Sequence, residues 1–169
     1  MPSRAYDFRP LSTADLALVG RWLSAPHVMA WWGEADEQFA LVSGDLAEGC
    51  LEQYLVAVAG RPIGYLQCYD VAAWPQSGFG HQPPGTRGID QFIGEPDMIG
   101  QGHGSQFIRA FVDRLLATGC PRVLTDPDPA NARAIRAYQK AGFCVEREVA
   151  TSEGRALLMI RDSNQTRPA

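Results

Sequence analysis

The sequence predicts an α/β (α+β) fold in which a mixed, mostly antiparallel central sheet is flanked by helices. Short apolar runs of strand length alternate with longer segments whose apolar residues recur at helical spacing. The 169 residues are 46% apolar and 20% charged, which is ordinary for a globular protein with a sizeable core. We therefore expect a single domain over residues 1–162 and a flexible tail over residues 163–169.

The first half of the chain is expected to place two helices among three strands. Thr13 is a suitable N-cap for the first helix, and Pro26 would break that helix. The second helix is expected to be interrupted near Ser43-Gly44. A run that is apolar on both faces is typical of a central strand, and Gly60-Arg61-Pro62 turns it into a hairpin. The predicted elements are a strand at Tyr6–Pro10, helices at Ala14–Leu23 and Glu34–Gly49, and strands at Tyr54–Ala59 and Ile63–Tyr69.

The second half begins with a long loop, Val71–Thr86, which is rich in glycine and proline. A loop of this length in a compact domain is usually functional or mobile. The helix that ends near Ala117 carries apolar residues on one face, as expected for packing on a sheet. The other predicted elements are a strand at Arg87–Ile93, a strand at Arg122–Asp126, a helix at Asn131–Ala141 and strands at Phe143–Thr151 and Arg155–Arg161.

Composition and charge limit the classes of function that the chain can have. The net charge of −4 argues against nucleic acid as a partner and suits a cationic substrate. No run of about 18 apolar residues is present, so no membrane span is expected. The N-terminus lacks the apolar stretch of a signal peptide, which predicts a cytoplasmic location. The cysteines form no C-x-x-C pair, and we expect buried free thiols rather than a zinc site or a disulfide framework at Cys50, Cys68, Cys120 and Cys144.

A glycine loop is the most informative local feature. In the stretch Ile99-Gly100-Gln101-Gly102-His103-Gly104, glycines alternate with other residues directly before an amphipathic helix at Ser105. Glycine permits positive φ and close approach of the backbone, and a helix start offers N–H groups to an anion. The loop is therefore a candidate phosphate site. It lacks the lysine of a P-loop and the glycine spacing of a Rossmann fingerprint.

A second motif runs from Asn131 to Phe143. Asn131 is suited to be a helix N-cap, and Gly142 is suited to end the helix before the next strand. Between them, one helix face is formed by Ala134, Ala137, Tyr138 and Ala141.

The two motifs resemble those of the GNAT acetyltransferases, which bind coenzyme A. Gly102 and Gly104 match the family's Arg/Gln-x-x-Gly-x-Gly loop, although Ile99 occupies its first position, and the second motif resembles N-x-x-A-x-x-x-Y-x-x-x-G-F. Within the family, the chain is similar to the aminoglycoside 6′-N-acetyltransferases from roughly Leu16 to Met159. The segments that carry this likeness are Trp31-Trp32-Gly33, Pro62-Ile63-Gly64-Tyr65, Arg87-Gly88-Ile89-Asp90-Gln91 and Thr125-Asp126-Pro127.

The resemblance implies transfer of an acetyl group from acetyl-CoA, without a metal, to a primary amine of a small cationic substrate. The expected acceptor is the 6′-amine of an aminoglycoside, and the expected assembly is a monomer or homodimer. Aminoglycoside enzymes of this type carry acids in the loop that corresponds to Val71–Thr86, where this sequence has none. A lysine-like amine, as in siderophore assembly, is therefore an alternative, as are protein N-acetylation and a non-catalytic module that binds coenzyme A or an antibiotic.

The resemblance also assigns site residues. Those expected at coenzyme A are Phe92, Gln101, Gly102, His103, Gly104, Ser105, Asn131, Ala134 and Tyr138. Those expected at the amine substrate are Trp32, Gln67, Asp90, Asp126 and Glu153. The backbone amide near Phe92 would polarise the thioester carbonyl. The side chain of His103 is expected to face solvent rather than act as a base.

Two residues are candidates for proton transfer. A phenol can protonate a departing thiolate, with ordinary pKa values of ~10 and ~8.5, so Tyr138 is the candidate acid; a core tyrosine is the alternative. Asp90 interrupts an apolar strand and is the candidate base or the anchor for the substrate ammonium group. Its ordinary pKa near ~3.9 would have to rise, or water would have to relay the proton. A structural ion pair with Arg87 or another arginine is the alternative for Asp90.

The remaining acids have plainer alternatives. Asp126 ends a strand, where ligand groups gather in open sheets, yet it equally suits a turn before Pro127. Asp128 is expected to be solvated or to form a turn, and Glu153 occupies a hairpin turn where a solvated acid is the usual case.

Overall fold

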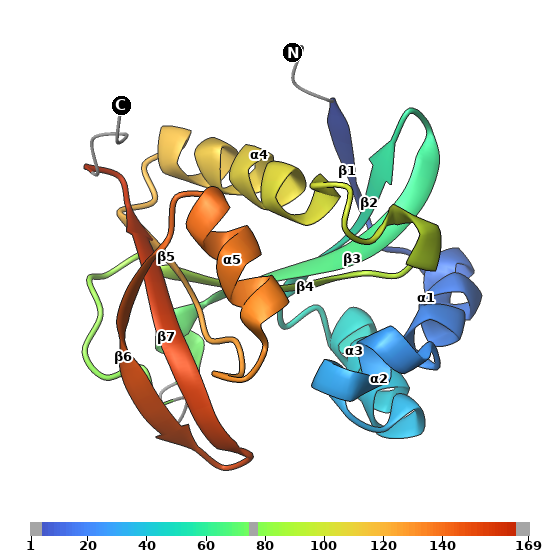
Figure 1. Ribbon diagram of the computed structural model, residues 1–169, viewed down its shortest axis with the longest axis horizontal. Helices are drawn as coiled ribbons and strands as arrows, with labels where there is room; N and C mark the ends of the chain where they lie inside the picture. The colour runs from blue at the N-terminus through green and yellow to red at the C-terminus, as the bar shows by residue number, and fades with distance from the viewer. Residues whose placement is uncertain (1–4, 75–77, 165–169) are drawn as a thin grey trace. The chain divides into compact units, whose positions relative to one another are not determined.

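The computed structural model describes residues 5–74 and 78–164, and Figure 1 shows the arrangement of its elements. The strands are β1 (Tyr6–Pro10), β2 (Glu52–Val58), β3 (Arg61–Asp70), β4 (Arg87–Ile93), β5 (Arg122–Thr125), β6 (Cys144–Thr151) and β7 (Gly154–Asp162). The helices are α1 (Leu16–Leu23), α2 (Pro26–Trp32), α3 (Ala35–Glu48), α4 (His103–Ala117) and α5 (Ala132–Lys140). The 3₁₀ turns are η1 (Thr13–Asp15), η2 (Val71–Ala73) and η3 (Pro96–Met98).

The strands form a seven-stranded sheet in the order β1-β2-β3-β4-β5-β7-β6. Strand β4 runs parallel to β5, whereas β1–β2, β2–β3, β5–β7 and β6–β7 are antiparallel pairs. The prediction of a mixed, mostly antiparallel sheet is therefore confirmed. The predicted tail over residues 163–169 lies outside the described residues from 165 onward.

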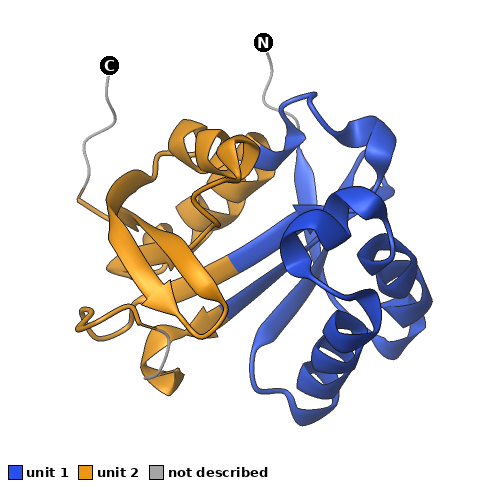
Figure 2. Cartoon of the chain, turned by 60° about the horizontal axis from the view of Figure 1, so that its bottom comes forward, with its two compact units in different colours: residues 1–68, 90–104 blue, residues 69–89, 105–169 orange. Residues whose placement is uncertain are grey.

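The chain divides into two compact units, coloured separately in Figure 2. Unit 1 comprises Met1–Cys68 and Asp90–Gly104, and unit 2 comprises Tyr69–Ile89 and Ser105–Ala169. Strand β4 passes from unit 2 into unit 1 between Ile89 and Asp90.

In unit 1, helices α1, α2 and α3 bury one face of the sheet. Alternate residues of a strand point to the same face, and the inward ones here include Leu55 on β2, Tyr65 on β3 and Phe92 on β4. They share a core with Val19 and Trp22 of α1. The other buried members of this core are Leu11, Leu23, Val28 and Val42.

In unit 2, helices α4 and α5 each bury an apolar face. On α4, Ile108, Phe111 and Val112 are buried, as their helical spacing predicts. On α5, Tyr138 and Ala141 are buried. The outermost strand, β6, has mostly exposed residues, whereas its hairpin partner β7 supplies buried core side chains.

In the N-terminal region, two local predictions are wrong and one helix was not predicted. The first helix ends at Leu23, before Pro26, as expected, but Pro26 then begins the additional helix α2, where its missing N–H costs no hydrogen bond. Helix α3 runs without interruption through Ser43, whose hydroxyl donates to the Phe39 carbonyl (2.7 Å), and ends before Gly49 at φ 67°. The N-cap of the first helical turn is Ser12 rather than Thr13.

The cysteine prediction is correct only in part. All four cysteines are free, but only Cys68 is buried, Cys120 is partly buried, and Cys50 and Cys144 are exposed. An apolar neighbourhood in sequence does not decide burial at the end of a helix or on an edge strand. Among the described residues, no helix has both the length and the apolar character needed to span a bilayer.

Gly94 permits the close approach of α1 to the segment after β4. A Cβ atom at this position would lie 2.1 Å from Trp22 Cδ2. We expect Gly94→Ala to lower the free energy of unfolding by about 1–3 kcal/mol, because the surrounding core would be overpacked. Gly44→Ala is the matched control, since a Cβ there meets nothing within 4 Å and α3 gains up to about 1 kcal/mol. Equal effects of the two changes in urea unfolding would contradict this account.

Candidate active site

A polar row crosses the helix-covered face of the sheet in unit 1. Gln53 on β2 is the register partner of Gln67 on β3, and Leu55 is the partner of Tyr65. On β4, Asp90 lies two residues before Phe92, so the two side chains share a face. The same sheet face therefore has an apolar row formed by Leu55, Tyr65 and Phe92 beside a polar row.

Hydrogen bonds link this polar row into a chain. The Gln53 Nε2 group donates to the backbone carbonyl of Val42 on α3 and to Tyr65 Oη, both at 2.9 Å. The Tyr65 hydroxyl donates to Gln67 Oε1 (2.9 Å), and Gln67 Nε2 donates to Asp90 Oδ2 (2.9 Å). The structure thus brings together Gln67 and Asp90, both predicted at the substrate amine.

The Asp90 carboxyl group is set up to be a stronger base than an ordinary aspartate. Burial raises its pKa, and the hydrogen bond from Gln67 opposes part of that rise. Among the described residues of unit 1, no arginine forms an ion pair with Asp90. The pKa of Asp90 is thus shifted in the direction that a base requires, and desolvation is the cause.

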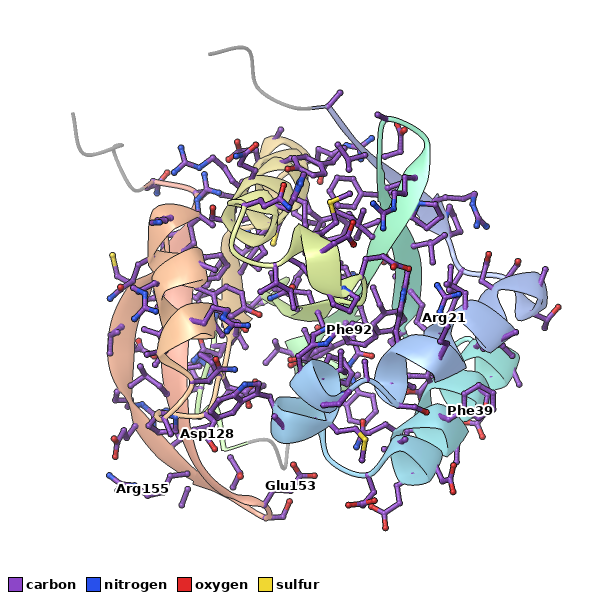
Figure 3. All side chains as sticks on the ribbon, turned by 45° about the vertical axis from the view of Figure 1, so that its right-hand side comes forward. Arg21, Phe39, Phe92, Asp128, Glu153 and Arg155 are labelled. Carbon is purple, nitrogen blue, oxygen red and sulfur yellow. The ribbon has the colours of Figure 1, made fainter. Side chains whose placement is uncertain are left out.

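Aromatic rings surround the apolar end of the same face. The Trp32 ring lies edge-on to Phe92 (4.9 Å between centroids) and to Tyr65 (6.0 Å), and Tyr65 stacks on Phe92 at 5.4 Å. Trp31 is 47% exposed, so one of the two adjacent tryptophans packs on the core, as expected. Figure 3 shows Phe92 among the side chains inside unit 1, whereas Arg21 and Phe39 extend from the outer helices.

The glycine loop adopts the backbone conformation that its sequence predicts. Gly100 and Gly102 have φ values of 77° and 81°, which side chains with a Cβ rarely adopt. Helix α4 begins at His103, earlier than the expected start at Ser105, so Gly104 belongs to its first turn. The side chain of Gln101 donates to the carbonyl of Asp97 in η3. A helix start that follows such a loop is a typical position for an anion site.

The prediction that His103 faces solvent is wrong. Its side chain is buried (4% exposed), and Nδ1 shares a hydrogen bond with Tyr6 Oη on β1 at 2.9 Å. The two rings also meet edge to face, with centroids 5.9 Å apart. Because the helix starts at His103, this residue is the first of α4 and its side chain turns inward toward β1.

Glu95 anchors the segment between β4 and the glycine loop. Its carboxylate accepts from the Trp22 indole (2.8 Å) and pairs with Arg21 (2.8 Å) and Arg61 (3.5 Å). These donors hold the pKa of Glu95 below its usual range, the Trp22 hydrogen bond contributing most. Sequence reasoning did not single out Glu95, Gln53 or Tyr65. For Gln53 and Tyr65, the alternation of polar and apolar residues on β2 and β3 was the signal that could have indicated them.

In unit 2, the α5 motif forms as predicted. The Asn131 side chain caps the helix by accepting from the Ala134 N–H (3.1 Å), and Gly142 follows the helix at φ 99°. Tyr138 is 4% exposed, and its ring meets Phe143 edge-on at 5.4 Å. This burial is compatible with a core tyrosine and equally with an acid whose hydroxyl donates a proton to a bound ligand. Ser105 is partly buried in α4.

The other acids of unit 2 differ in setting. Asp126 directly follows β5 and is partly buried. Asp128 accepts from the Ala130 N–H (2.7 Å), which confirms its expected turn role. Glu153 is exposed in the β6–β7 hairpin turn, at the far end of that hairpin in Figure 3.

The described part of the loop after β3 is anchored. Phe79 is buried, and its carbonyl accepts from the side chains of Gln82 (2.8 Å) and Arg147 (3.0 Å). Arg122 donates in turn to Gln82 Oε1 (3.1 Å). Residues 75–77 of this loop lie outside the described residues. Across residues 5–74 and 78–164, no group of histidine, cysteine, aspartate and glutamate has the arrangement of a metal site.

Known proteins are similar to this chain in architecture and in sequence. The family model for the acetyltransferase (GNAT) domain matches residues 12–151. The aminoglycoside N(6′)-acetyltransferase type 1 of Klebsiella pneumoniae is 37% identical over 95% of this chain and 83% of its own length. The crystal structure of aminoglycoside acetyltransferase AAC(6′)-Ib in complex with coenzyme A and kanamycin superimposes with a TM-score of 0.83 at 32% identity, covering 94% of this chain and 95% of that one.

A more distant relative is named for a different acceptor, lysine. The lysine N-acyltransferase MbtK of Mycolicibacterium paratuberculosis is 26% identical over 95% of this chain and 75% of its own length.

The Tyr6–His103 hydrogen bond should contribute to stability. We expect Tyr6→Phe to lower the free energy of unfolding by about 1 kcal/mol, because a buried ring nitrogen loses a partner. Tyr54→Phe is the control: its hydroxyl donates to exposed Glu52 (2.7 Å), so the change should stay within about 0.5 kcal/mol. Urea unfolding of both variants measures the difference, and similar losses would refute a special role for the buried pair.

Proposed function

Because the chain belongs to the GNAT family of acetyltransferases, we propose that it transfers the acetyl group of acetyl-CoA to the 6′-amine of an aminoglycoside. Membership of this family makes acetyl-CoA the cosubstrate and N-acetylation the reaction. The matched region, residues 12–151, supports one acetyltransferase domain over residues 1–162. We place the reaction in the cytoplasm, where acetyl-CoA is available, and in a monomer or homodimer.

One structural observation carries the proposal. Asp90 places a carboxyl group with a raised pKa beside the apolar row of a sheet face that helices cover. A primary amine is protonated at neutral pH and must lose a proton before it can attack a thioester. A carboxylate made more basic by desolvation attracts the ammonium group and accepts that proton, directly or through one water molecule.

The remaining steps follow from acyl-transfer chemistry. The neutral amine attacks the thioester carbon and a C–N bond forms, while the C–S bond breaks with the electron pair leaving on sulfur. The nitrogen then loses its second proton, which replaces the proton that the thiolate takes up. We assign polarisation of the carbonyl to the backbone N–H near Phe92 and protonation of the thiolate to the Tyr138 hydroxyl. Gln101, Gly102, His103, Gly104 and Ser105 would hold the pyrophosphate at the start of α4, and Asn131 and Ala134 would contribute from α5.

The substrate side of the proposal is a cationic amine. Gln67 lies on the same sheet face as Asp90, and Trp32 of α2 packs on Phe92 of that face, to which we assign the substrate. Asp126 and Glu153 are proposed to attract further ammonium groups, in keeping with a net charge of −4. Glu153 is exposed and so is open to a ligand.

A specific observation favours a second candidate acceptor, a lysine-like amine. No acidic residue occurs in Val71–Thr86, and the described part of that loop is held by Arg122 and Arg147. A loop without acids gives a polycation none of the attractive contacts that an acidic loop would provide, whereas a substrate with one ammonium group needs fewer of them. The lysine N-acyltransferase relative is in keeping with this candidate.

A substrate panel tests the proposal. Purified protein would be incubated with acetyl-CoA and, separately, kanamycin, ribostamycin, a lysine-type amine and a peptide mixture, with thiol release and product mass followed. We expect a singly acetylated aminoglycoside. Product with the lysine-type amine alone favours the second candidate. Binding of coenzyme A without any product would reduce the protein to a non-catalytic binding module.

Removing the Tyr138 hydroxyl should slow the reaction without unfolding the protein. We expect Tyr138→Phe to lower kcat by roughly 100-fold, the lower end of what general acid catalysis contributes. The ring stays packed against Phe143, so the unfolding midpoint should change little. Steady-state thiol release measures kcat. A variant with full activity would show that Tyr138 is a core tyrosine with no part in proton transfer.

Asp90 should control the pH dependence of the reaction. Activity needs the ionised carboxylate, so kcat/KM should be full above the pKa of Asp90 and fall as the pH drops through it. Because burial raises this pKa, that fall should lie above the ordinary aspartate value of about 3.9. Asp90→Asn should abolish both the activity and this limb of the profile. An unchanged acidic limb in the variant would assign the limb to another group.

A further inference from the structure

The hydrogen-bond chain from Val42 to Asp90 has a donor-to-acceptor direction, here called its sense, which is set at the Val42 end. A backbone carbonyl accepts hydrogen bonds and never donates, so the Gln53 side chain must present its NH₂ group to Val42. The same NH₂ group faces Tyr65 Oη. The Tyr65 oxygen therefore accepts a hydrogen bond from Gln53, and its O–H group donates to the next residue of the chain.

The sense then passes to Asp90. The Tyr65 proton requires an acceptor, which places Oε1 of Gln67 toward Tyr65 and the Gln67 NH₂ group toward Asp90. Reversal would require the Gln53 amide to turn over and set its carbonyl oxygen against the carbonyl oxygen of Val42. Tyr65 remains a donor throughout, because burial raises the pKa of its hydroxyl above the ordinary value.

A buried polar atom without a partner accompanies this arrangement. Gln53 is only 6% exposed, and its Oε1 atom is buried without a hydrogen-bond partner among the described residues. An unsatisfied buried acceptor is costly and uncommon in native proteins. The NH₂ group of the same side chain makes two hydrogen bonds of the chain, to Val42 and to Tyr65.

We propose that Gln53 and Tyr65 are positioning residues that fix the sense of this chain, so that Asp90 Oδ2 stays a hydrogen-bond acceptor and Oδ1 is the oxygen that takes the substrate proton. Neither residue needs to touch a substrate. The part concerning the substrate proton rests on the proposed function, in which Asp90 is the base, whereas the sense of the chain does not.

Two titratable groups on neighbouring elements of unit 1 have contacts that are defined. The charge of Asp45 on α3 raises the pKa of Tyr65, and His27 on α2 bonds the Ile93 carbonyl (2.9 Å). Neither forms a hydrogen bond with a member of the chain. The chain is thus the route by which a change at Gln53 would reach Asp90.

Tyr65→Phe tests the proposal, because it keeps the ring that stacks on Phe92 and removes only the hydroxyl. Gln67 would then be free to turn its carbonyl oxygen toward a protonated Asp90, which stabilises the protonated form. We expect the titration midpoint of the Asp90 carboxyl group, followed by carbon-13 NMR in the free protein, to move toward higher pH by about one unit. The acidic limb of kcat/KM should move with it.

Gln53→Met provides a second route if Tyr65→Phe fails to fold, since it keeps the length of the side chain and removes both donors. It should move the Asp90 midpoint in the same direction. Tyr54→Phe is the matched control on β2 and should leave both the midpoint and kcat/KM unchanged. An Asp90 midpoint equal to that of the wild type in Tyr65→Phe and in Gln53→Met would overturn the proposal.

The design separates this proposal from the proposed function. The NMR titration needs neither acetyl-CoA nor an amine, so it reports on the chain even if no amine is acetylated. A shifted midpoint in a protein without transferase activity would support the chain and refute the role of Asp90 as base. A shifted midpoint together with a shifted acidic limb would support both.

Discussion

The hydrogen bond from Gln67 to Asp90 is the interaction on which the candidate active site depends. A carboxylate on an apolar sheet face loses much of its hydration, and the loss is tolerable only if polar groups replace the water. Strand alternation supplies them, since Gln53, Gln67 and Asp90 stand on the face that also carries Tyr65 and the helix-covered core. The same desolvation that makes the carboxylate costly makes it a better base.

The glycine loop depends on a separate set of contacts within unit 1. Its approach is fixed by the backbone N–H groups of Gly94 and Glu95, which donate to the Ile63 carbonyl (2.8 and 3.3 Å), and by the pairs that Glu95 forms with Trp22 and Arg21. Its exit is fixed where His103 bonds Tyr6. A loop with positive φ at two glycines gains little stability by itself, so both anchors help to keep the backbone in the shape that an anion requires.

Family membership supports the reaction more directly than the acceptor. Membership of the GNAT family establishes the cosubstrate and the class of reaction. In the proposed function, the acceptor is selected by groups outside the shared motifs, among them the exposed Glu153 and the acid-free loop Val71–Thr86. A fold shared with aminoglycoside enzymes is therefore weaker support for the amine than for the acetyl donor.

The sequence by itself determined the strands, most helices, the glycine loop and the α5 motif, because each follows from local periodicity or from a cap. Asn131 and Gly142 bound α5 through contacts a few residues apart, which a linear pattern contains. Only the tertiary structure decided that His103 is buried, that α3 continues through Gly44 and that α2 begins at Pro26. It alone joined Gln53, Tyr65 and Asp90 into one chain, because strand register, a long-range property, sets which side chains become neighbours.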